Sequence, residues 1–131
     1  MIYNKVTEIT DSGYVVETLV RKNTPDILND SSNKSLEHTT YRKTSARYIY
    51  NSKPVYAHLT ATFAYDKSKN DVNCISKYET YDNNRFFYTV SLTSKKQPRK
   101  AFATLKYNIN SISPGYNKTL EISCDSKGNA S

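Results

Sequence analysis

The chain has 131 residues, of which 37% are hydrophobic and 24% are charged, and its mean hydropathy is −0.74. This length suits one domain and leaves little room for a second core. The 12 Tyr and 4 Phe supply apolar bulk that disordered chains lack. No apolar run of about 18 residues occurs, so the sequence predicts no membrane span. We therefore predict a single folded domain over residues 1–131.

The N-terminal half alternates apolar and polar residues in four stretches. They are predicted as strands at 2–9, 14–20, 39–50 and 55–65. A turn signal at 10–13 makes a hairpin of the first two, and the short turn at 51–54 joins the last two. Between the hairpins, a polar loop is predicted at about 21–38.

The stretch 55–65 has the clearest strand pattern, because side chains alternate between the two faces of a strand. The residues predicted to face the core are Val55, Ala57, Leu59, Ala61, Phe63 and Tyr65. His58 lies on the opposite, more polar face, between Tyr56 and Thr60.

The C-terminal half contains four more predicted strands. They lie at 72–78, 86–92, 101–109 and 118–124. The first is predicted to place Val72, Cys74, Ser76 and Tyr78 on one face. The second is predicted to place Phe86, Tyr88, Val90 and Leu92 on one face. The segment 93–100 between the second and third of these strands is the most basic of the chain and is predicted as a loop.

About eight short strands with turn signals between them, and no amphipathic helix, indicate an all-β domain. We predict a two-sheet antiparallel sandwich that is immunoglobulin-like in architecture. The likeness stops at architecture, because antibody domains pack a Trp against their disulfide and this chain contains no Trp.

Two cysteines, Cys74 and Cys124, lie 50 residues apart in strand-like stretches. No His or second Cys stands near either one, so the pattern does not indicate a zinc site. We predict a disulfide between them, which implies an oxidising, extracellular setting. The alternative is two buried free thiols in a cytosolic protein. The N-terminus lacks the features of a signal peptide, so secretion requires a signal that has been cut away.

The chain is basic, with 19 Lys and Arg against 12 Asp and Glu and a net charge of +7. Four basic and six acidic residues lie in 1–40, so the excess positive charge lies in 41–131. Such a bias favours contact with nucleic acid or anionic cell-wall polymers, although for a small secreted protein plain solubility is the more ordinary explanation. The candidate polyanion-binding residues are Arg42, Lys43, Arg47, Lys95, Lys96, Arg99 and Lys100. Their alternative role is to solvate the rim of the sheets and to block edge-to-edge pairing.

Three parts of the chain together form a recognisable pattern. They are a Thr-x-Thr-Phe-x-Tyr strand at 60–65, Cys74 after it, and a Cys-x-x-x-Gly-Asn-x-Ser ending at 124–131. The chain resembles in these parts a family of small secreted all-β proteins of Gram-positive Firmicutes, although it has few Gly and no Trp. The resemblance implies secretion, the disulfide and an all-β fold. No activity is assigned to the family as a whole, so it implies no substrate.

No catalytic motif accompanies the two histidines, and we interpret His38 and His58 as bystanders. A Cys74–His58 nucleophilic pair would need a reduced and exposed thiol, whereas the strand pattern points Cys74 inward. We therefore predict no enzyme activity, no cofactor and no metal site. The predicted function is that of a secreted binding protein whose partner is an anionic polymer or a protein at the cell exterior. A basic polyanion-binding module and a small hydrolase are the alternatives.

Overall fold

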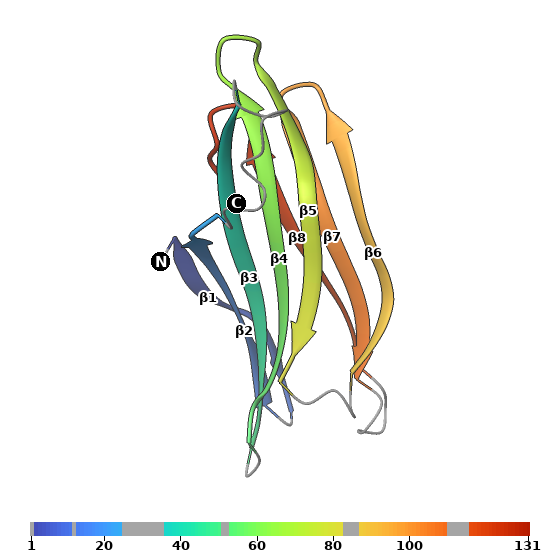
Figure 1. Ribbon diagram of the computed structural model, residues 1–131. Helices are drawn as coiled ribbons and strands as arrows, with labels where there is room; N and C mark the ends of the chain where they lie inside the picture. The colour runs from blue at the N-terminus through green and yellow to red at the C-terminus, as the bar shows by residue number, and fades with distance from the viewer. Residues whose placement is uncertain (1, 12, 25–35, 51–52, 83–86, 110–115) are drawn as a thin grey trace.

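The computed structural model describes residues 2–11, 13–24, 36–50, 53–82, 87–109 and 116–131. These residues form eight long strands, and no helix among them could span a membrane (Figure 1). The strands are β1 (Tyr3–Thr10), β2 (Gly13–Lys22), β3 (Glu37–Ile49), β4 (Val55–Asp66), β5 (Asp71–Tyr81), β6 (Phe87–Gln97), β7 (Lys100–Ile109) and β8 (Tyr116–Asp125).

The strands form two antiparallel sheets, one in the order β1-β2-β3-β4-β5 and one in the order β6-β7-β8. The predicted all-β fold with two antiparallel sheets is therefore confirmed. Within each sheet every strand pairs with its neighbour in sequence. An immunoglobulin domain instead brings non-consecutive strands together, in the orders A-B-E-D and C-F-G.

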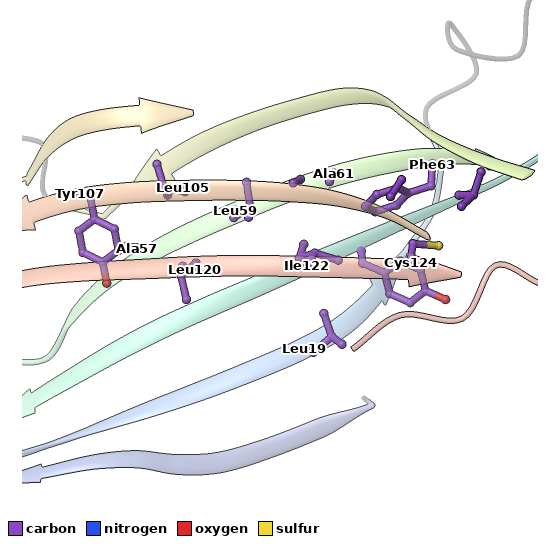
Figure 2. Close-up of a cluster of buried hydrophobic side chains, with 14 of the residues drawn as sticks. Leu19, Ala57, Leu59, Ala61, Phe63, Leu105, Tyr107, Leu120, Ile122 and Cys124 are labelled. Carbon is purple, nitrogen blue, oxygen red and sulfur yellow. The ribbon is translucent and has the colours of Figure 1, made fainter. Parts of the chain in front are cut away.

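The hydrophobic core contains residues from both sheets (Figure 2). The predicted inward face of β4 is confirmed, because Leu59 and Phe63 are completely buried there. Leu105 of β7 and Ile122 of β8 belong to the same cluster and are equally buried. Burial of one such side chain stabilises the fold by about 1.5–3 kcal/mol, so these alternating apolar residues hold the two sheets together.

Two predicted loops differ from the structure. β2 continues to Lys22 and β3 begins at Glu37, so the predicted loop at 21–38 is shorter, and its residues 25–35 lie outside the described part of the chain. The basic segment 93–100 is a tight hairpin and not a loop, because Gln97 pairs directly with Lys100. Strand pairing continues through these polar residues because backbone hydrogen bonds do not require apolar side chains.

Because β5 contains a β-bulge, the prediction of which of its residues share one face is partly wrong. Ser76 pairs with Thr62 and Cys74 pairs with Phe63, so Ile75 is an extra residue without a partner on β4. An extra residue moves every later side chain to the other face of the sheet. Tyr78 is therefore 45% exposed, although the uninterrupted alternation placed it inward.

A second bulge in β6 has the same effect. Thr89 pairs with Tyr107 and Ser91 with Lys106, which leaves Val90 as the extra residue. The predicted inward positions Tyr88 and Val90 are 59% and 56% exposed, whereas Phe87 and Leu92 pack against the core. Phe86, the remaining member of that predicted face, lies outside the described residues.

The cysteines form no disulfide, so this prediction was wrong. Cys74 is partly buried in β5 and Cys124 is completely buried in β8, and both are free. Each thiol points to a backbone oxygen close to it in sequence, Cys74 Sγ to Ser76 O and Cys124 Sγ to Asp125 O, at 3.5 Å in both cases. The two strands belong to different sheets, and the two sulfur atoms are not close enough to bond.

Both thiols are expected to react slowly in the native protein. Burial raises the pKa of both, that of Cys124 to about 12. Because the thiolate is the nucleophile and a raised pKa lowers its population, iodoacetamide at pH 8 should label both cysteines rapidly only in denaturant. The intact mass should be the same with and without reductant. A gain of two hydrogen masses on reduction would contradict the free-thiol arrangement.

Candidate functional site

The seven predicted polyanion-binding residues lie in three separate places. On β3, Arg42 points to the outer face of the five-stranded sheet, whereas Lys43 and Arg47 point to the inner face and are only 8% and 9% exposed. Lys43 Nζ donates a hydrogen bond to Glu121 O at 2.6 Å. Alternation along β3 thus separates residues that are close in sequence.

The other four residues lie together at the exposed β6–β7 hairpin, at the upper end of the molecule in Figure 1. Lys96 Nζ forms an ion pair with Asp71 Oδ1 at 2.5 Å, and Lys95 Nζ lies 4.8 Å from the centre of the Phe102 ring. Arg99, in the turn, has a φ of 70°. The seven residues therefore do not form one continuous groove.

A small pocket of about 110 Å³ lies on the outer face of the five-stranded sheet and crosses four strands. Among the residues that the structure describes, those that line it are all polar or amphipathic and none is acidic: Lys22, Asn23, Thr40, Arg42, Thr60, Thr62, Ser76 and Tyr78. The floor is formed by three threonines, each no more than 4% exposed, and the half-exposed Tyr78 lies beside it.

Hydrogen bonds between neighbouring strands fix the floor of this pocket. The hydroxyls of Thr40 and Thr62 lie 2.7 Å apart, and those of Thr24 and Thr40 lie 3.0 Å apart. Arg42 Nε donates to Thr60 Oγ1 at 3.1 Å. Because buried polar groups are costly unless they are paired, these bonds explain how threonines can be buried on an outer face.

His58 lies on the same face of β4 as Thr60 and Thr62, and its surroundings differ from those predicted. Its Nδ1 lies 2.8 Å from Thr44 Oγ1, and its Nε2 lies 3.2 Å from Asp82 Oδ1. The sequence pattern had shown no acidic residue in register with it, because Asp82 follows the end of β5 and reaches β4 only through the strand pairing. A hydroxyl, an imidazole and a carboxylate in a row resemble the order of groups in a hydrolase triad.

The lower part of this face carries tyrosines. The rings of Tyr14 and Tyr48 are stacked, with centroids 4.9 Å apart, and the ring of Tyr56 is parallel to that of His58 at 6.3 Å. The outer face of the five-stranded sheet therefore joins an aromatic area to a hydroxyl-lined pocket.

Two larger hollows, of about 510 and 400 Å³, lie elsewhere and are wide open to solvent. The first is lined partly by Asn108 and Asn117 and the second by Tyr81 and Phe87. Because neither hollow encloses space that could hold a ligand away from solvent, we base no site on them. Within the described ranges, no group of three His, Cys, Asp or Glu side chains could hold a metal ion.

Sequence reasoning missed the pocket, although part of the signal was present. The pattern of 55–65 placed Thr60 and Thr62 on the polar face. It could not show which residues of β3 and β5 lie beside them, and it assigned Lys22 to a loop. Comparison of the chain with protein-family models, with curated proteins and with solved structures gives no match.

Proposed function

We propose that the chain is a secreted, non-enzymatic β-sandwich protein that binds a polar ligand at the cell exterior through the outer face of its five-stranded sheet. The pocket floored by Thr40, Thr60 and Thr62 carries this proposal. Solvent-facing sheet surfaces are normally lined by exposed side chains, whereas these hydroxyls are buried and pre-ordered by hydrogen bonds. A pre-ordered polar floor lowers the cost of fixing a ligand.

Secretion is supported by the resemblance to small secreted Firmicutes proteins and by the basic charge. Basic proteins are attracted to anionic cell-wall polymers by their net charge alone. The free thiols remove the support that a disulfide would have given to secretion, so the proposal rests on the resemblance and the charge. A protein of this size can fold around a hydrophobic core without a disulfide.

A polyanion-binding module remains the second candidate, and the exposed β6–β7 hairpin favours it. The hairpin brings Lys95, Arg99 and Lys100 together beside the ion pair of Lys96. Such a cluster would bind many phosphates weakly and with a steep dependence on salt concentration.

The two candidates are distinguished by filling the pocket. Ser76→Trp is expected to abolish binding of the fluorescently labelled protein to isolated Gram-positive cell walls, because the indole would occupy the space beside Thr62. Thr93→Trp is the matched control, since Thr93 is exposed on the outer face of the small sheet and should leave binding unchanged. Binding that survives Ser76→Trp, or that is absent in the wild type, would contradict the pocket as the working surface.

A separate assay tests whether the chain is an enzyme. The row of Thr44, His58 and Asp82 favours a small hydrolase as a further candidate. With esters, amides and phosphoesters as substrates, we expect no turnover above background by the wild type. Hydrolysis that disappears in His58→Ala would overturn the non-enzymatic part of the proposal.

A further inference from the structure

We propose that the pocket on the outer face of the five-stranded sheet binds a phosphate-type oxyanion. This inference rests on the proposed function, because it names the chemical group that the pocket takes. The two cationic lining residues, Lys22 and Arg42, carry it, together with the hydroxyl floor.

The lining has the charge that an oxyanion requires. Lys22 pairs with Thr40 across β2 and β3, and Arg42 lies two residues further along the same face of β3, so the two cations are diagonal neighbours. Within the part of the chain that the structure describes, neither side chain forms an ion pair, and no acidic residue lines the pocket. Like charges at this separation repel each other, and a bound anion would remove that repulsion.

Arg42 is held in position and still has donors to offer. Its Nε donates to Thr60 Oγ1, which fixes the plane of the guanidinium. Among the described residues, its two terminal NH₂ groups have no hydrogen-bond partner. A guanidinium presents its donors as a planar fork that matches two oxygens of a phosphate.

The hydroxyls supply further donors at the floor of the pocket. Thr60, Thr62 and Ser76 belong to adjacent strands, and each hydroxyl can turn its proton toward an acceptor. Lys and Arg can only donate hydrogen bonds. An anionic group that only accepts them therefore suits this pocket better than a neutral amide, which also donates.

The size of the pocket limits the size of the group that it can hold. At about 110 Å³ it is well below the roughly 300–1,000 Å³ of sites that enclose a whole small molecule. It corresponds to the liquid volume of about four water molecules. A compact charged group fits this space, whereas the rest of a larger ligand would have to lie outside, over Tyr78 and the neighbouring sheet surface. The group can therefore come from free phosphate or from a phosphodiester of a wall polymer.

Titration of the ¹⁵N-labelled protein with two probes tests this inference. Inorganic phosphate and poly(glycerol phosphate) are added separately, and the amide signals of the pocket strands are followed. We expect saturable shifts at Thr60 and Thr62, and a loss of affinity of about tenfold or more in Arg42→Gln, because hydrogen bonds to charged groups are the strong ones. Arg99→Gln removes the same charge from the distant hairpin and should change the affinity by less than about twofold.

Lys22→Gln is a second variant that leaves the hydrogen bond from Arg42 to Thr60 intact. A loss of phosphate affinity in this variant therefore cannot be attributed to a local disturbance around Arg42. Saturation by both probes would identify the phosphate group itself as the ligand, and saturation by the polymer alone would identify the polymer-borne diester. The inference would be overturned if neither probe gave saturable shifts, or if Arg42→Gln and Arg99→Gln lost the same amount of affinity. If Ser76→Trp still abolishes cell-wall binding in that case, the pocket remains the binding surface and only its anion preference is wrong.

Discussion

Replacing Gly128 with alanine is expected to lower the free energy of unfolding by about 3 kcal/mol. Gly128 has a φ of +84°, in the left-handed region that L-residues with a Cβ disfavour. An added Cβ would lie 2.5 Å from Tyr65 Cζ and 2.7 Å from Tyr65 Cε1. Tyr65 is only 8% exposed and cannot move away without disturbing the core. Both the backbone and the contact therefore oppose the substitution.

The expected loss of stability is large because Gly128 lies in the turn that folds the C-terminal segment back onto the core. Asp125 Oδ1 accepts hydrogen bonds from the backbone N–H groups of Lys127 and Asn129, both at 2.9 Å. Tyr41 Oη donates to Gly128 O at 2.5 Å, and Ser123 exchanges two backbone hydrogen bonds with Ser131. A displaced Gly128 would break this network and expose the buried tyrosines.

Urea unfolding and amide hydrogen exchange at Ser123 and Ser131 measure this effect. Faster exchange at these two amides with unchanged global stability would show that the segment detaches alone. Lys127→Ala is the control, because this exposed side chain can be removed without loss of the backbone bonds, at a cost within about 0.5 kcal/mol. If Gly128→Ala stays within the same margin, the close packing on Tyr65 is wrong.

The strands that keep a strict period of two were predicted well. In β4 every predicted inward residue lies in or against the core, and in β7 alternate residues from Ala101 to Ile109 belong to the same core, because one buried face dictates the pattern over the whole strand. In β5 and β6 the bulges at Ile75 and Val90 change the face in mid-strand. Neither position contains a glycine or a proline that would have indicated a bulge.

The candidate site was less predictable, because it depends on strand register. The turn at 51–54 by itself would pair Tyr50 with Val55, and Arg47 would then face His58. The structure pairs Arg47 with Val55 and brings Thr44 to His58 and Arg42 to Thr60. The predicted disulfide failed for a related reason, since alternation shows that a cysteine faces inward but not how far it lies from another inward cysteine.

Replacing Phe63 with alanine is expected to lower the free energy of unfolding by about 4 kcal/mol. Phe63 is completely buried in the cluster shared by both sheets, near Ile122 and Cys124 of β8 in Figure 2. Truncation removes the apolar contacts of the ring and leaves a cavity that the two rigid sheets cannot close. Chemical denaturation followed by far-ultraviolet circular dichroism measures the change.

Tyr88→Ala is the control that also tests the bulge in β6. An unbroken alternation would bury Tyr88 beside Leu92, and its truncation would then cost as much as that of Phe63. The structure leaves Tyr88 59% exposed, so the expected cost is below about 1 kcal/mol. A small loss for Tyr88 with a large loss for Phe63 supports the two-sheet core with its bulge at Val90. Equal losses would mean that β6 runs without a bulge and that the outer face of the small sheet has been assigned to the wrong residues.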